Sequence, residues 1–165
     1  MTKRLWCWYR LIPLILVLSG CASKPVRTVE FGDMVNSRHR VLIATQESVF
    51  KEAVAAEVID GLERELCHVR LIDVGRLDEE STEDYDAIVI ATLCVARHTP
   101  RRVERFIDRV REKDKVVLLV TAGSGKCGSR PSQVDAITSA STMNNAVMIA
   151  ESIIERVEML LSSHD

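Results

Sequence analysis

The chain has 165 residues, of which 47% are hydrophobic and 28% are charged, a composition that is ordinary for one folded domain and unlike that of a disordered tail. The formal net charge is -2, and acidic and basic residues are mixed along the chain. The sequence therefore offers no basic surface for a polyanion, and we expect no nucleic-acid partner.

Residues 1–20 have the three-part pattern of a secretion signal. Lys3, Arg4 and Arg10 make the N-terminal end positive, and an apolar run follows at 11–18. That run is far shorter than the roughly 20 residues that a membrane-spanning helix needs. The pattern predicts a signal peptide rather than a permanent membrane span.

The segment Leu18-Ser19-Gly20-Cys21 resembles the lipobox of bacterial lipoprotein precursors. The resemblance implies cleavage after Gly20 and diacylglycerol on the thiol of Cys21, with acyl chains such as palmitate holding an exported protein at the inner or outer membrane of the envelope. Each buried methylene adds roughly 0.8 kcal/mol to that hold. The alternative is an uncleaved anchor or an ordinary secretory signal, in which Cys21 is a chance cysteine. Polar residues predict a tether over 21–38 and a folded domain over 39–165.

Three continuous apolar runs predict strands that helices cover on both faces, and they are residues 41–44, 87–91 and 116–120. A mixed run at 69–74 predicts an edge strand, and 135–139 predicts a fifth strand. Stripes of apolar residues predict helices over 49–62, 103–110 and 146–161, whereas 75–84 is expected to be a loop or one short turn. This alternation predicts a doubly wound, three-layer α/β sandwich with a parallel sheet in the order 2-1-3-4-5.

The segments 40–45, 85–90 and 115–121 are similar to strands of the flavodoxin-like family, and the similarity covers most of residues 40–161. It implies a ligand site outside the carboxyl ends of the strands, where flavodoxins hold FMN. The first such loop offers Thr45, Ser48 and Lys51 to a phosphate, but it has no glycine, and Glu47 is negative. The alternative is that Ser48 caps a helix whose positive end Glu47 complements. The second loop follows Thr92 and contains no aromatic residue.

The third loop, residues 122–130, is rich in glycine, so its backbone N–H groups can approach an anion. The candidate binding residues here are Gly123, Ser124, Gly125 and Lys126. The spacing is not that of a P-loop, and a flexible connection is an equal alternative. Residues 135–143 also resemble the FMN-binding stretch of exported proteins in which a final Thr carries covalent FMN. Met143 holds that position, so the attachment is not implied.

Outside residues 1–21 the chain has three cysteines, in a compartment where disulfides form. Cys94 and Cys127 follow strands that we expect to be neighbours, and we predict a disulfide between them that contributes roughly 3 to 4 kcal/mol. Cys67 is expected to be a buried thiol. Cys94 and His98 lack a third ligand, so no metal site is predicted.

We interpret the chain as a lipid-anchored binding or accessory module without tightly bound FMN and without an enzyme activity that the sequence can name. Its ligand is then an envelope protein or a small anion. The alternative is an FMN-dependent electron carrier or flavin reductase on the same fold.

Overall fold

The computed structural model describes residues 25–123, 126–128, 131 and 133–163, so the expected signal peptide and Cys21 lie outside it. These residues form one six-stranded sheet in the order β1-β3-β2-β4-β5-β6. The strands are β1 (Val29–Phe31), β2 (His39–Thr45), β3 (Cys67–Asp73), β4 (Ala87–Leu93), β5 (Val116–Thr121) and β6 (Asp135–Ser139). All neighbours are parallel except β1 and β3. The predicted order 2-1-3-4-5 is confirmed for the five parallel strands.

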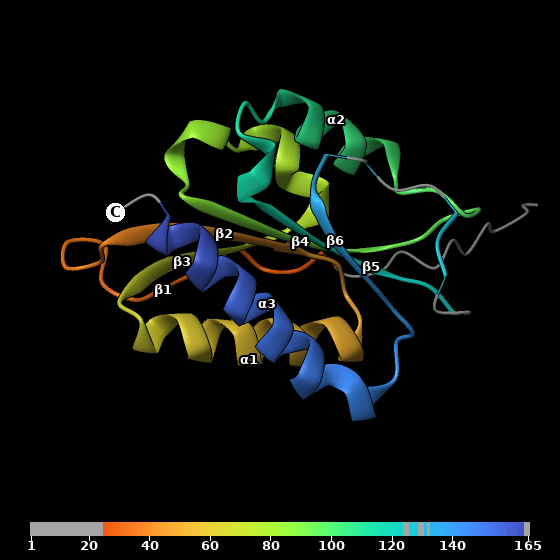
Figure 1. The fold of residues 1–165 in the computed structure, drawn as a ribbon, viewed down its shortest axis with the longest axis horizontal. Coiled ribbons are helices and arrows are strands. Elements are labelled where there is room, and N and C mark those ends of the chain that lie inside the picture. The colour runs from red at the N-terminus through yellow and green to blue at the C-terminus, as the bar shows by residue number, and fades with distance from the viewer. Residues whose placement is uncertain (1–24, 124–125, 129–130, 132, 164–165) are drawn as a thin grey trace, which may run out of the picture.

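Helices cover both faces of the sheet and make the three predicted layers (Figure 1). One face carries α1 (Val49–Arg64) and α3 (Ala146–Ser162), and the other carries α2 (Arg101–Arg109) and the 3-10 helix η1 (Val74–Glu79). Three further single turns are 3-10 helices at Thr82–Asp84, Lys113–Lys115 and Met143–Asn145. Over the part of the chain that is described, no helix has the length and apolar content to cross a membrane.

The apolar runs of the sequence are buried because each strand is covered on both sides. In β2, Val41 and Ile43 pack under α1 and α3, whereas Leu42 and Ala44 pack against the α2 side. None of the four is more than 1% exposed. Continuous apolar sequence is what such double coverage requires, so these strands could be located from the sequence alone.

The N-terminal edge of the sheet differs from our expectation, because the predicted tether over 21–38 is in part folded. Residues 29–31 form β1, which pairs antiparallel with β3, so β3 is not the edge strand. Phe31 packs against the α1 side of the core, and the neighbouring Glu30 forms an ion pair with Arg70 on β3, with 2.6 Å between Oε1 and Nη1. The amide of Val26 donates to Asp73 Oδ2 at 3.0 Å, so the folded unit extends at least to Val26.

Candidate functional site

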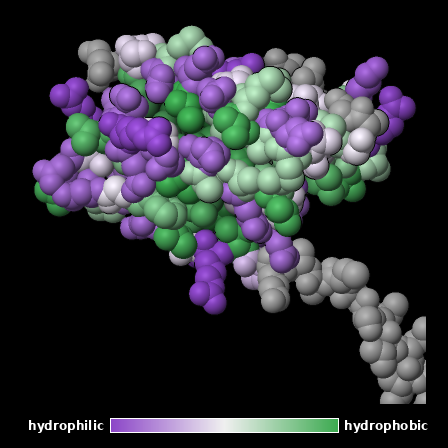
Figure 2. Space-filling model, turned by 90° about the horizontal axis from the view of Figure 1, so that it is seen from below, coloured by the Kyte–Doolittle hydropathy of each residue, from purple (hydrophilic) through white to green (hydrophobic). Residues whose placement is uncertain are grey.

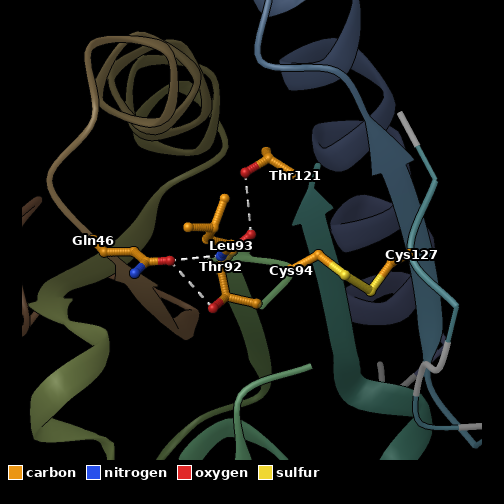
Figure 3. Close-up of a disulfide and its surroundings, with 6 residues drawn as sticks. All are labelled: Gln46, Thr92, Leu93, Cys94, Thr121 and Cys127. Atoms are coloured by element: carbon orange, nitrogen blue, oxygen red, sulfur yellow. Dashed lines mark hydrogen bonds between the residues drawn. A yellow bond between two sulfur atoms is a disulfide. The ribbon is translucent and has the colours of Figure 1, made fainter. Parts of the chain in front are cut away.

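The candidate site lies at the end of the sheet where the parallel strands reach their carboxyl ends (Figure 3). Thr45 ends β2, Leu93 ends β4, Thr121 ends β5 and Ser139 ends β6. The register places Leu93 opposite Thr121, and Thr121 opposite Ser139. The three loops that the sequence singled out therefore leave the sheet at one edge, as the fold requires.

The loop from β2 to α1 is fastened by its own polar side chains. Ser48 is the N-cap of α1, and its hydroxyl accepts a hydrogen bond from the amide of Lys51 at 3.5 Å. This is the capping role that we considered as the alternative to phosphate binding. Gln46 was not among our candidates, yet its Oε1 accepts from the amide of Leu93 at 2.6 Å and from the hydroxyl of Thr92 at 3.3 Å (Figure 3). Thr92 therefore takes part in a hydrogen-bonded link between the first and second loops.

Two polar side chains, one at the end of β2 and one in the first turn of α1, are largely buried. The Thr45 side chain is on the α1 side of β2, 1% exposed, and its hydroxyl has no hydrogen bond within the described residues. Lys51 is in the first turn of α1 and is 4% exposed. In the same part of the chain, no hydrogen bond or ion pair of its ammonium group is found, and burial lowers the pKa of Lys51. Such groups are costly to bury unless something charged or polar satisfies them.

The second and third loops are joined covalently. Cys94 and Cys127 form a disulfide with 5.9 Å between their Cα atoms, the pair that the strand order predicted (Figure 3). The amide of Cys94 also donates to the carbonyl oxygen of Thr121 at 2.8 Å. Beyond Cys94 a tight turn puts Ala96 and Arg97 at φ 49° and 68°, and a Cβ on Gly128 would lie 3.2 Å from the Arg97 carbonyl oxygen. The two loops are thus held against each other.

Of the remaining candidates in the third loop, only Gly123 and Lys126 lie within the described residues. Gly123 and Lys126 are exposed, and nothing lies within 4 Å of the position of a Cβ on Gly123. Ser124 and Gly125 lie outside the described residues. His98 is exposed, and the described residues contain no group of three His, Cys, Asp or Glu that could hold a metal ion. Cys67 is a buried free thiol, as expected.

The residues at the carboxyl ends of the strands suit the phosphate of FMN but not its flavin ring. The start of α1 offers helix N–H groups and the Lys51 ammonium to a phosphate. The ring of a flavin needs a flat apolar slot, and the loop from 94 to 98 has no aromatic residue to supply one. The described aromatic side chains are Phe31, Phe50, Tyr85 and Phe106, and the last three are at most 4% exposed. We conclude that the residues present do not fit a stacked flavin.

Solved structures of flavodoxin type share this fold. A flavodoxin from the domain Archaea has 12% sequence identity and a TM-score of 0.51, and the match covers 73% of this chain and 98% of that one. The Flv1 flavodiiron core from Synechocystis sp. PCC6803 has 12% identity and a TM-score of 0.53, covering 78% of this chain and 37% of that one. An oxidoreductase from Corynebacterium diphtheriae has 15% identity and a TM-score of 0.51, with 76% and 97% covered.

No protein-family model matches the sequence, and no curated protein matches it. The TM-scores of 0.51 to 0.53 show the flavodoxin-like fold, and identities of 12 to 15% carry no further conclusion about function.

Proposed function

We propose that this chain is an exported, lipid-anchored binding domain that takes a small anion at the start of α1. The observation that carries the proposal is Lys51, a largely buried side chain whose ammonium group has no hydrogen bond or ion pair among the described residues. A charge in that position is stabilised by an ion of opposite sign, and the positive end of a helix favours the same ion.

The groups around Lys51 support an oxyanion such as phosphate. The first N–H groups of α1 have no partner inside the helix, although Ser48 already satisfies the amide of Lys51. The unpaired hydroxyl of Thr45 can donate one more hydrogen bond. The Lys51 ammonium and the donors that are not already bonded would hold a phosphate or carboxylate group without any aromatic contact.

A second candidate is FMN-dependent electron transfer. The likeness of the fold to flavodoxins favours it, since an FMN phosphate would use the same donors. The loops beside which a flavin ring would lie oppose FMN binding, because Gln46 and the Cys94–Cys127 disulfide tie these three loops to one another. We therefore rank anion binding first.

The anchoring part of the proposal rests on the resemblance of residues 18–21 to a lipobox, because Cys21 lies outside the described residues. Mass spectrometry of the mature protein tests it: acyl chains on an N-terminal Cys21 support anchoring. A mature protein that begins elsewhere, or a Cys21→Ser variant that still fractionates with membranes, overturns it.

Anion binding is tested by thermal unfolding of the mature protein in buffers with and without inorganic phosphate. A bound ion stabilises the fold by RT ln(1 + [L]/Kd), which is about 2.7 kcal/mol at a hundredfold excess over Kd. We expect Lys51→Met to remove this stabilisation and to raise the melting temperature without phosphate, because the largely buried side chain then carries no unpaired charge.

Lys115→Met is the matched control. Lys115 is also a buried lysine, but its ammonium donates to the Tyr85 carbonyl oxygen at 2.9 Å. This variant should be less stable and still respond to phosphate. A phosphate response that survives Lys51→Met would overturn the proposal. Micromolar FMN binding, with visible absorbance, would move the electron carrier to first place.

A further inference from the structure

An apolar groove runs between α1 and the β1–β3 edge of the sheet. Its inner part has a volume of about 350 Å³, and apolar side chains of Phe31, Ala55, Ile59 and Leu71 line it. A second hollow of about 320 Å³ adjoins it and shares Leu71. Figure 2 shows the face that carries α1 and α3, on which hydrophobic surface lies between hydrophilic side chains.

The outer end of this groove is formed by the N-terminal segment itself. Pro25 and Val26 line the second hollow, and Val26 is fixed by its hydrogen bond to Asp73. Three residues separate Pro25 from Cys21, so at full extension the two Cα atoms are at most about 14 Å apart. Any lipid on Cys21 is therefore attached close to the mouth of the groove.

The rim of the groove carries charges of both signs. Glu52, Asp60 and Glu63 line the groove on the α1 side, Asp60 is paired with Arg64, and Arg27 lines the second hollow. The apolar interior therefore decides what the groove can hold. A diacylglycerol thioether on cysteine has acyl chains and no ionised group, so its acyl chains suit this interior.

We propose that the groove holds one acyl chain of the lipid on Cys21 while the remaining chains stay in the bilayer. The inference rests on the anchoring part of the proposed function. For the acyl chain, transfer from bilayer to groove exchanges one apolar surrounding for another. The gain comes from the groove, because the partly buried side chains of Phe31 and Leu71 lose their remaining contact with water.

The test is photo-crosslinking of the full lipidated protein in membranes. Cells that produce the protein are fed a palmitate analogue with a diazirine, the membranes are irradiated, and the peptides carrying the analogue are identified by mass spectrometry. We expect crosslinks from Cys21 to residues 52–63 and 67–73 of the same chain.

Two variants on neighbouring positions sharpen this test. Ala56 is exposed and lines the groove, so Ala56→Trp should fill it and lower the crosslink yield by about tenfold, equivalent to about 1.4 kcal/mol. Glu57 is also exposed and is outside the groove lining, and Glu57→Trp should leave the yield unchanged.

The outcomes separate this inference from the proposed function. A mature protein without acyl chains on Cys21 overturns both. Acylated protein that crosslinks only to bilayer lipid overturns the inference and leaves anchoring in place. Crosslinks from the lipid to the groove of another copy, or an unchanged yield in Ala56→Trp, overturn it as well.

Discussion

Removal of the Cys94–Cys127 disulfide should cost a large part of the stability of the domain. The two cysteines are 33 residues apart in the sequence. The chain-entropy relation for a closed loop of that length gives about 12.5 cal/mol/K, or about 3.7 kcal/mol at 25 °C. Domains of this size are stable by about 5 to 15 kcal/mol, so the bond contributes a quarter or more of the total.

The assay is urea unfolding of the oxidised protein, the reduced protein and the Cys94→Ser/Cys127→Ser variant. With a slope of about 1.5 kcal/mol/M, the midpoint should fall by on the order of 2 M both on reduction and in the variant. Reductant should not change the variant, which controls for other effects of the reagent. A loss below about 1 kcal/mol would refute the reasoning, because the unfolded chain would then gain little freedom from the open loop.

Two substitutions and one labelling experiment test other parts of the fold. Gly32→Ala should destabilise the fold by about 2 kcal/mol or more in urea unfolding, because φ is 78° there and a Cβ would lie 2.5 Å from the Cys67 carbonyl oxygen. Gly123→Ala is the control: a Cβ there lies in open space, so this variant should be as stable as the wild type. Equal effects of the two substitutions would contradict the prediction. Burial raises the pKa of the Cys67 thiol to about 11, so iodoacetamide at pH 8 should modify Cys67 only in unfolded protein, as mass spectrometry would show; rapid labelling of the folded form would argue against burial. Glu80→Gln should cost about 1.5 to 3 kcal/mol at pH 7, since Glu80 accepts hydrogen bonds from Arg70. Burial raises the pKa of Glu80, but Arg70 and its other partners together lower it by more, so this contribution is complete above the ordinary value of 4.5 and is lost as the pH falls through the lower folded pKa. The difference between the wild type and Glu80→Gln should therefore shrink in acid, and a constant difference down to pH 2 would disagree.

The sequence could predict those segments in which every residue has to meet the same requirement, such as burial. The runs at 41–44, 87–91 and 116–120 are apolar at every position because helices cover both faces of each strand. The disulfide could be predicted in turn, because Cys94 and Cys127 follow neighbouring parallel strands.

The parts that the sequence could not predict depend on partners far along the chain. β1 has only three residues, too few for a periodic pattern, and it pairs with a strand far along the chain, with Glu30 opposite Arg70. Gln46 links two loops only because β2 and β4 are in register, which no local pattern reveals. At Ser48 the capping role could be stated in advance, because the cap is a local signal.

The direction in which β1 meets β3 determines how the domain bears mechanical load. β1 runs from Val29, opposite Leu71, to Phe31, opposite Val69, so the N-terminal segment leaves toward the carboxyl end of β3. A pull on that segment along the strand axis loads the backbone hydrogen bonds of the pair together, in shear. A force perpendicular to the strand axis would instead open one bond at a time. With the anchor that we propose on Cys21, a pull along this axis would therefore meet the more resistant arrangement.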